Sequence, residues 1–300
     1  MKRLRYMIEA ALLYLLIGVF SLLPPETASA WGGAIGRFIG PKLAASRKAL
    51  RNLERALPDK TQQEYSNIIT GMWENLGRVV AEYPHLNEIA RNHTEIINGH
   101  IIDELRQTGQ PIIFIAGHLA NWEIPASVSC LQKQTPLALI YRAPNNPLVD
   151  RLLDKYRSLK GRLETIPKAS SGMRDTIKNL KNGDHIGILV DQKYNEGVAA
   201  PFFGHLAMTS PAFVSLSQNY DAYILPCRCE RINGANFRVT LYPPIPSIDV
   251  NSGEKRNELD VIKDTHTLLE EWITEHPEQW LWLHRRWDSQ RLKKEETSDE

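Results

Sequence analysis

The chain has 300 residues, of which 42% are hydrophobic and 24% are charged, so it can bury a substantial core and does not have the composition of a disordered chain. Its formal net charge of +1 hides an asymmetry, because residues 1–60 carry ten lysines and arginines against four acids. This end is expected to favour an anionic surface. The three cysteines are too few for a disulfide framework, and no cysteine and histidine pattern has zinc spacing. We therefore expect a reduced, cytosolic globular part without a structural metal.

Residues 1–30 have the composition of a membrane anchor. A basic start precedes an uncharged stretch, and residues 6–23 offer 18 positions with one glutamate among them. A spanning helix needs about 20 apolar residues, so the length is borderline. Small residues before position 31 leave signal-peptide cleavage as an alternative. The apolar and basic residues 31–55 favour an uncleaved anchor, which either spans the membrane once or lies in its interface.

The rest of the chain has the pattern of one α/β domain at residues 31–290, followed by a charged tail, residues 291–300, that is predicted to be disordered. From residue 101 onward, helical segments alternate with short apolar runs, which is typical of a mainly parallel sheet flanked by helices. Helices are predicted at residues 62–83, 101–107, 121–134, 146–161, 172–183, 210–220 and 257–275. Strands are predicted at residues 111–117, 135–142, 163–167, 185–192 and, as a final antiparallel pair, 222–232 and 236–245.

Polar residues follow three of the predicted parallel strands. His118 follows the first strand, Arg142 follows the second, and Asp191 and Gln192 end the fourth. In open α/β sheets, ligands bind in the crevice beyond the carboxyl ends of the strands. We therefore expect these residues to meet at one edge of the sheet.

The stretch GHLANWE, residues 117–123, places Glu123 five positions after His118. A histidine can accept a proton near neutral pH, and a carboxylate on its second ring nitrogen would fix the tautomer and stabilise the imidazolium. If a helix starts near Asn121, the chain turns and brings the Glu123 carboxylate beside the ring. The pair would then activate a substrate hydroxyl. The alternative is structural, with His118 capping the loop and Glu123 favouring the helix N-terminus by its charge.

The other candidates are assigned to substrate binding or to an oxyanion, each with a structural alternative. The guanidinium of Arg142 could serve the oxyanion or a substrate phosphate, or it could pair with an acid such as Asp150. Asp191 either supports the site, as Gln192 would, or forms an Asx turn. Contact with substrate and capping of the next helix are the two alternatives for Asn145 and Ser210.

The C-terminal motif WLWLHRRW, residues 280–287, predicts a second contact with the membrane. Arg285 and Arg286 stand beside Trp282 and Trp287, a composition expected near lipid headgroups. The same residues are a weak basis for a nucleic-acid interface, because the cluster is short and no recognition motif accompanies it. We therefore expect no nucleic-acid partner.

The order of the motifs along the chain adds a resemblance. GHLANWE is followed by YRAPNNPLVDRLL at 141–153, by ILVDQKYNEGVAAPFFGHLAMTSPA at 188–212, and by WLWLHRRW. This series resembles the late acyltransferases of lipid A biosynthesis, the lauroyl/myristoyl acyltransferase family. The resemblance covers nearly the whole chain, and its middle block is highly specific. The family is related to the glycerolipid acyltransferases that share an H-x4-D/E motif, so it implies a glycerolipid-acyltransferase-like α/β fold with an N-terminal membrane-anchor helix.

The resemblance implies an enzyme of the bacterial inner membrane with its catalytic domain on the cytoplasmic face. Such an enzyme would transfer a fatty acyl chain from acyl carrier protein to a hydroxyl of a 3-hydroxyacyl chain on a lipid A precursor. The implied partners are the carrier protein, the precursor and the inner membrane, and no cofactor or metal is expected. In the inferred mechanism, His118 takes the proton of the acceptor hydroxyl while Glu123 holds His118.

Three other interpretations stay open at this point. The acceptor could be a lysophospholipid or a glycosylated phospholipid. The chain could be a membrane-tethered binding protein that keeps the fold without turnover. A secreted hydrolase is the third, and it depends on cleavage after residue 30.

Overall fold

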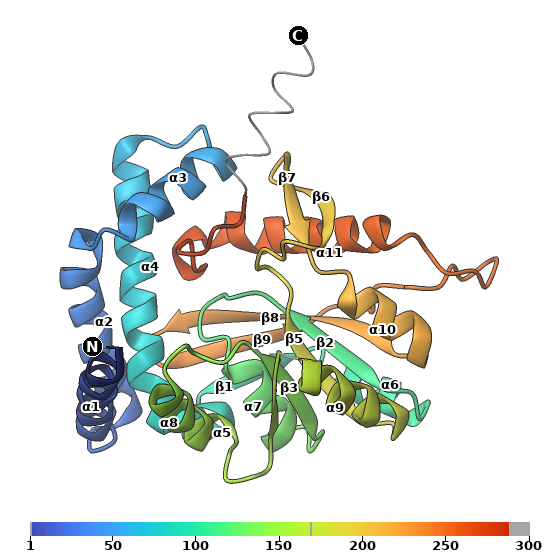
Figure 1. Ribbon diagram of the computed structural model, residues 1–300, viewed down its shortest axis with the longest axis horizontal. Coiled ribbons are helices and arrows are strands. Elements are labelled where there is room, and N and C mark those ends of the chain that lie inside the picture. The colour runs from blue at the N-terminus through green and yellow to red at the C-terminus, as the bar shows by residue number, and fades with distance from the viewer. Residues whose placement is uncertain (1, 169, 288–300) are drawn as a thin grey trace.

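The computed structural model describes residues 2–168 and 170–287. The N-terminal helices lie beside a seven-stranded sheet, and further helices cover that sheet (Figure 1). This architecture confirms the predicted α/β fold with a mainly parallel sheet and flanking helices. The helices are α1 (Lys2–Phe20), α2 (Pro25–Ile39), α3 (Ser46–Ala56), α4 (Gln62–Glu82), α5 (Leu86–Asn92), α6 (His100–Gln107), α7 (Ile124–Leu131), α8 (Pro147–Arg157), α9 (Ser170–Lys181), α10 (Ala212–Tyr220) and α11 (Glu258–Glu275).

The main sheet has the strand order β1-β9-β8-β2-β5-β3-β4. Its neighbouring strands are parallel except for the pair of β8 and β9. The strands are β1 (Thr94–Ile97), β2 (Ile112–Ala116), β3 (Leu137–Tyr141), β4 (Glu164–Pro167), β5 (His185–Leu189), β8 (Tyr223–Asn233) and β9 (Asn236–Leu241). Strands β2 and β5 pair at the centre of the sheet. Because helices cover both faces of a parallel sheet, the apolar run of β2 is buried, as its sequence predicts.

Two parts of the strand pattern were not predicted from the sequence. Strand β1 has only four residues, and it adds to the edge of the sheet beside β9. The second is a separate antiparallel hairpin formed by β6 (Val198–Phe202) and β7 (His205–Thr209). A proline inside β6 argues against a strand, and the turn places Phe203 at a φ of 50°, where a bulky residue is rare.

Helix α4 joins the N-terminal helices to the sheet. Thr61 and Glu64 form a capping box at its start, which satisfies two backbone N–H groups. Helix α2 packs against it very closely, because a Cβ at Gly36 would lie 2.1 Å from the carbonyl oxygen of Trp73. At Gly32 a Cβ would lie 2.4 Å from the carbonyl oxygen of Gly77. Glycine is therefore required at this helix crossing.

Among the described residues, no helix is long and apolar enough to cross a membrane. The spanning form of the predicted anchor at residues 1–30 is therefore not supported. Charged residues at positions 3, 5 and 9 interrupt α1, and the chain turns before Pro25, so the apolar residues are divided between α1 and α2. The predicted tail, residues 291–300, lies outside the described residues.

Candidate active site

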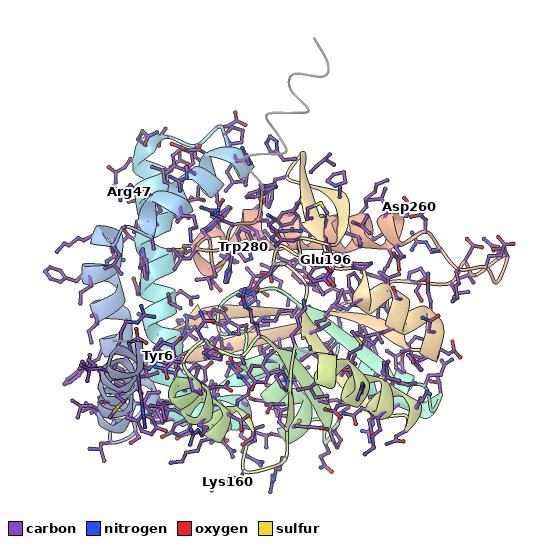
Figure 2. All side chains as sticks on the ribbon, in the orientation of Figure 1. Tyr6, Arg47, Lys160, Glu196, Asp260 and Trp280 are labelled. Atoms are coloured by element: carbon purple, nitrogen blue, oxygen red, sulfur yellow. The ribbon has the colours of Figure 1, made fainter. Side chains whose placement is uncertain are left out.

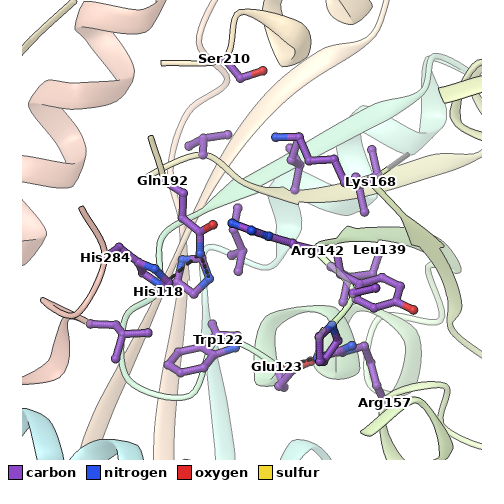
Figure 3. A pocket seen from close by; sticks show the side chains of 18 of the residues that line it. His118, Trp122, Glu123, Leu139, Arg142, Arg157, Lys168, Gln192, Ser210 and His284 are labelled. Atoms are coloured by element: carbon purple, nitrogen blue, oxygen red, sulfur yellow. Dashed lines mark hydrogen bonds and ion pairs between the residues drawn. The ribbon is translucent and has the colours of Figure 1, made fainter. Parts of the chain in front are cut away.

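A cavity of about 430 Å³ opens at the carboxyl ends of strands β2, β3 and β5, and His118 lies on its wall (Figure 3). His118 follows β2 and is 9% exposed. Arg142, Asn145, Gln192 and Ser210 line the same cavity. The prediction that residues from separate strand ends meet at one edge is confirmed, because β2, β5 and β3 are neighbours in the sheet.

The carboxylate bound to His118 belongs to Asp191. Its Oδ1 lies 2.7 Å from the His118 Nδ1, and its Oδ2 accepts the backbone N–H of His118 at 2.7 Å. The indole Nε1 of Trp280 donates to Oδ2 at 2.7 Å. Burial raises the pKa of the Asp191 carboxyl, but the charge and hydrogen bonds of His118, with the Trp280 bond, outweigh burial and hold that pKa well below its usual range. Asp191 is therefore a buried, charged carboxylate, and it places the proton of a neutral His118 on Nδ1.

The other ring nitrogen of His118 faces the amide of Gln192. The Gln192 Nε2 lies 3.0 Å from the His118 Nε2 and 3.1 Å from the His284 Nε2. An amide nitrogen has two N–H donors and no acceptor, so both imidazole nitrogens accept a hydrogen bond. Burial lowers the pKa of His284 to about 4, which keeps this ring neutral. The His118 Nε2 is thus an unprotonated acceptor at the cavity.

Glu123 does not hold His118, which corrects the sequence-based expectation. Its carboxylate is 3% exposed and binds Arg157 through two bonds, from Nε at 2.8 Å and from Nη2 at 2.7 Å. The hydroxyl of Tyr83 donates a third bond at 2.6 Å. Burial raises the pKa of Glu123, but the charge and hydrogen bonds of Arg157 lower it below the ordinary value, and Tyr83 and the charge of His118 add to this.

The loop explains why the glutamate turns away. Helix α7 begins only at Ile124, and Ala120 has a φ of 48°, so the intervening residues form a tight loop instead of a helical turn. Asn75 of α4 donates to the Ala120 carbonyl at 2.9 Å and holds that loop. Glu123 therefore faces α8 and Tyr83, which directly follows α4, while Asp191 reaches His118 from the segment after the neighbouring strand β5.

The structure decides part of the choice between substrate binding and a structural role for Arg142, Asn145 and Ser210. Asp150 accepts a bond from the Tyr141 hydroxyl at 3.4 Å, and the described residues show no ion pair between Asp150 and Arg142. Asn146, next to Asn145, caps α8 by accepting the backbone N–H of Leu148. Asn145 itself lines the cavity. Ser210 lies just before α10, where its Oγ accepts the N–H of Ala212 at 3.4 Å.

Three of the four residues assigned to lipid headgroups, Trp282, Arg286 and Trp287, are buried, which corrects that assignment for them, whereas Arg285 is exposed. Trp280, which Figure 2 labels, is 2% exposed, and Trp282 and Arg286 are both 0% exposed. Arg286 donates to Thr209 at 2.7 Å and lies 3.0 Å from His266. Composition alone could not separate a buried aromatic and basic cluster from an interfacial one.

Sequence reasoning missed several residues of the site. Trp280 and His284 come from the C-terminal motif, and Tyr83 and Arg157 come from segments that were predicted only as helices. Each of these residues is more than 30 positions from its hydrogen-bond partner, so no short sequence motif indicates the pairing. In residues 2–168 and 170–287, no group of three or more histidine, cysteine or acidic residues could hold a metal ion.

The chain matches the family of bacterial lipid A biosynthesis acyltransferases over residues 1–289. It belongs to this family. The match confirms the family that the sequence motifs resemble, and the chain is a lipid A acyltransferase. Its relatives include the lipid A biosynthesis lauroyltransferase of Escherichia coli K12, which is 28% identical over 79% of this chain and 76% of the relative. The myristoyltransferase of the same organism is 24% identical over 88% of this chain and 81% of the relative. The palmitoleoyltransferase of Escherichia coli K12 is 23% identical over 85% of this chain and 83% of the relative.

Proposed function

We propose that this protein transfers a fatty acyl chain from acyl carrier protein to a hydroxyl of a 3-hydroxyacyl chain on a lipid A precursor. The observation that carries the proposal is the unprotonated Nε2 of His118 at the cavity, with Asp191 on the opposite ring nitrogen. That pair is suited to deprotonating a hydroxyl. The donor and the position of the acceptor hydroxyl go beyond the family membership and are part of the proposal.

His118 acts as the base and then as the acid. Its Nε2 takes the proton from the acceptor hydroxyl as that oxygen attacks the thioester carbonyl. The tetrahedral intermediate then breaks its C–S bond, and the thiolate of the carrier takes the proton back from Nε2. Asp191 stabilises the imidazolium between these steps, because its carboxylate is charged and bonded to Nδ1.

Gln192 is the proposed donor to the oxyanion. Its amide occupies the His118 Nε2 in this structure, so the arriving hydroxyl takes its place and frees an N–H group beside the reacting carbon. In well-studied hydrolases one such donor contributes about 2.7–4 kcal/mol to the transition state. Glu123 is a positioning residue in this account, because it fixes the loop after His118 through Arg157 and Tyr83.

The test uses the full-length protein with labelled acyl carrier protein as the donor. Transfer is measured to a lipid A precursor and, in parallel, to a lysophospholipid and a glycosylated phospholipid. We expect the lipid A precursor to gain one base-labile ester and to be the best acceptor by at least about tenfold in kcat/KM. A preference for one of the other lipids would replace the proposed acceptor. Absence of transfer to all three would favour a binding protein without turnover.

We also propose that the protein works at the cytoplasmic surface of the inner membrane, with α1 and α2 against the lipid. Large apolar side chains are exposed along both helices, and Phe38 is 71% exposed. Beside them lies an apolar hollow of about 240 Å³, lined by residues of α1, α2 and α4. Such a patch, with the basic N-terminal end, fits an anionic lipid surface. The exposed side chains are Leu4, Met7, Ile8, Leu12, Tyr14, Leu15, Leu16, Val19, Leu22, Trp31, Ile35, Phe38 and Ile39.

Vesicle sedimentation tests this surface. Replacing Trp31 and Phe38 together by serine is expected to weaken binding to anionic vesicles by at least about tenfold, because two aromatic side chains no longer enter the lipid. Val250→Ser is the matched control, since this apolar side chain is 87% exposed elsewhere. Equal binding by all three proteins would remove α2 from the membrane contact.

A further inference from the structure

Two cations leave neighbouring strands at the same edge of the sheet. Strands β3 and β4 are parallel with Tyr141 opposite Pro167, so Arg142 and Lys168 are the next residues of each. The backbone N–H of Lys168 donates to the Tyr141 carbonyl at 2.7 Å, which fixes this alignment. Both side chains line the cavity that holds His118, and Figure 3 shows them extending into it from the same side.

Neither cation has a counter-charge in the part of the chain that the structure describes. No carboxylate there forms an ion pair with Arg142 or Lys168. The acid nearest to Arg142 in sequence, Asp150, accepts a bond from Tyr141. The acid nearest to Lys168, Glu164, accepts one from Asn179. Burial lowers the pKa of the Lys168 ammonium, and the positive charge of Arg142 lowers it further. The ring of Tyr194, 5.0 Å from the Lys168 Nζ, offers only a weak attraction. Two like charges held together at a cavity favour the binding of an anion.

We propose that Arg142 and Lys168 form a binding site for a phosphate group of a substrate, with the Ser210 hydroxyl as a third donor on the same cavity. A guanidinium can bind two phosphate oxygens at once, and an ammonium suits a third. Two cations match a doubly charged phosphate better than a singly charged carboxylate. This site deepens the proposed function and rests on it for the identity of the substrate.

The site lies close to the reacting centre. The charge of Arg142 reaches His284, where it contributes to the lowered pKa, and His284 shares the Gln192 amide with His118. A phosphate bound here therefore also offsets positive charge near the base. Phosphate occurs on glycolipid acceptors and in the phosphopantetheine arm of an acyl carrier protein, so both sources fit the same chemistry.

Equilibrium binding tests the site without turnover. Calorimetry with inorganic phosphate at low ionic strength is done on the full-length wild type, Lys168→Gln, Arg142→Gln and the control Lys181→Gln, an exposed lysine at the end of α9. We expect each site variant to weaken binding by at least about tenfold and the control to keep it, because a charge-assisted hydrogen bond is lost. Lys168→Arg keeps the charge and should keep most of the binding. Equal affinities in all five proteins, or no binding by the wild type, would overturn the site.

Transfer kinetics then separate the two sources. If the phosphate belongs to the acceptor, Lys168→Gln raises the KM for the phosphorylated acceptor at least about tenfold. The KM for the same acceptor without its phosphate stays the same. If the phosphate belongs to the donor, Lys168→Gln raises the KM for acyl-phosphopantetheine and leaves the KM for acyl-pantetheine the same. KM values that rise equally with and without phosphate would reject the site. A wild type that binds phosphate and transfers no acyl chain would retain the site and reject the proposed function.

Discussion

Replacing Asp191 by asparagine is expected to lower kcat for acyl transfer by about 10³–10⁴-fold, and His118→Ala by at least about 100-fold. Asp191 accepts the Nδ1 proton of His118 and keeps Nε2 free. An asparagine amide in its place can donate to Nδ1, which moves the ring proton to Nε2 and blocks the base. The negative charge that stabilises the imidazolium is lost as well.

The measurement is kcat at saturating donor and acceptor for the two variants and a control. Asp184→Asn is the matched control, because this exposed acid lies at the other end of the same strand, directly before β5. We expect the control to stay within about threefold of the wild type. If Asp191→Asn also stayed within this range, Asp191 would not be the partner of the base.

Replacing Glu123 by glutamine is expected to lower the free energy of unfolding by about 3–5 kcal/mol, because it leaves a buried guanidinium without its charge partner. The side chains of Arg157 and Glu123 are 8% and 3% exposed, and the Arg157 Nη1 already lacks a hydrogen-bond partner. The hydroxyl of Tyr83 would also lose its charged acceptor.

Urea unfolding of the wild type, Glu123→Gln and Glu95→Gln measures this effect. Glu95 pairs with Arg238 at the surface, with side chains 50% and 41% exposed, so its loss should cost at most about 1 kcal/mol. Replacing Arg157 by methionine together with Glu123→Gln should recover part of the stability, since no unpaired charge remains. Equal losses for Glu123→Gln and Glu95→Gln would show that the buried pair does not support the loop.

The sheet and the place of the site could be predicted, because both follow from local patterns. Apolar runs that alternate with amphipathic segments predict parallel strands, and polar residues at strand ends predict a crevice at their carboxyl edge. His118, Arg142 and Gln192 meet there, as expected. The hairpin at β6 and β7 could not be predicted, because its proline and its turn argue against strands.

The sequence could not predict the hydrogen-bond partner of His118, for a physical reason. Glu123 lies only five positions after His118, which makes a local pair the simplest expectation, whereas Asp191 is 73 positions away. The choice between them depends on the loop at Ala120 and on the buried guanidinium of Arg157, which attracts Glu123 more strongly. The C-terminal cluster was misassigned for a similar reason, since the partners of Arg286, Thr209 and His266, are far from it in sequence.

The central claim is that Asp191, and not Glu123, holds the base of an acyltransferase. It is tested most directly by comparing kcat for Asp191→Asn and Glu123→Gln in transfer from acyl carrier protein, with each rate corrected for the folded fraction. We predict a loss of kcat for Asp191→Asn that exceeds the loss for Glu123→Gln by at least about tenfold, because only Asp191 is bonded to the ring. A larger loss for Glu123→Gln would contradict the claim.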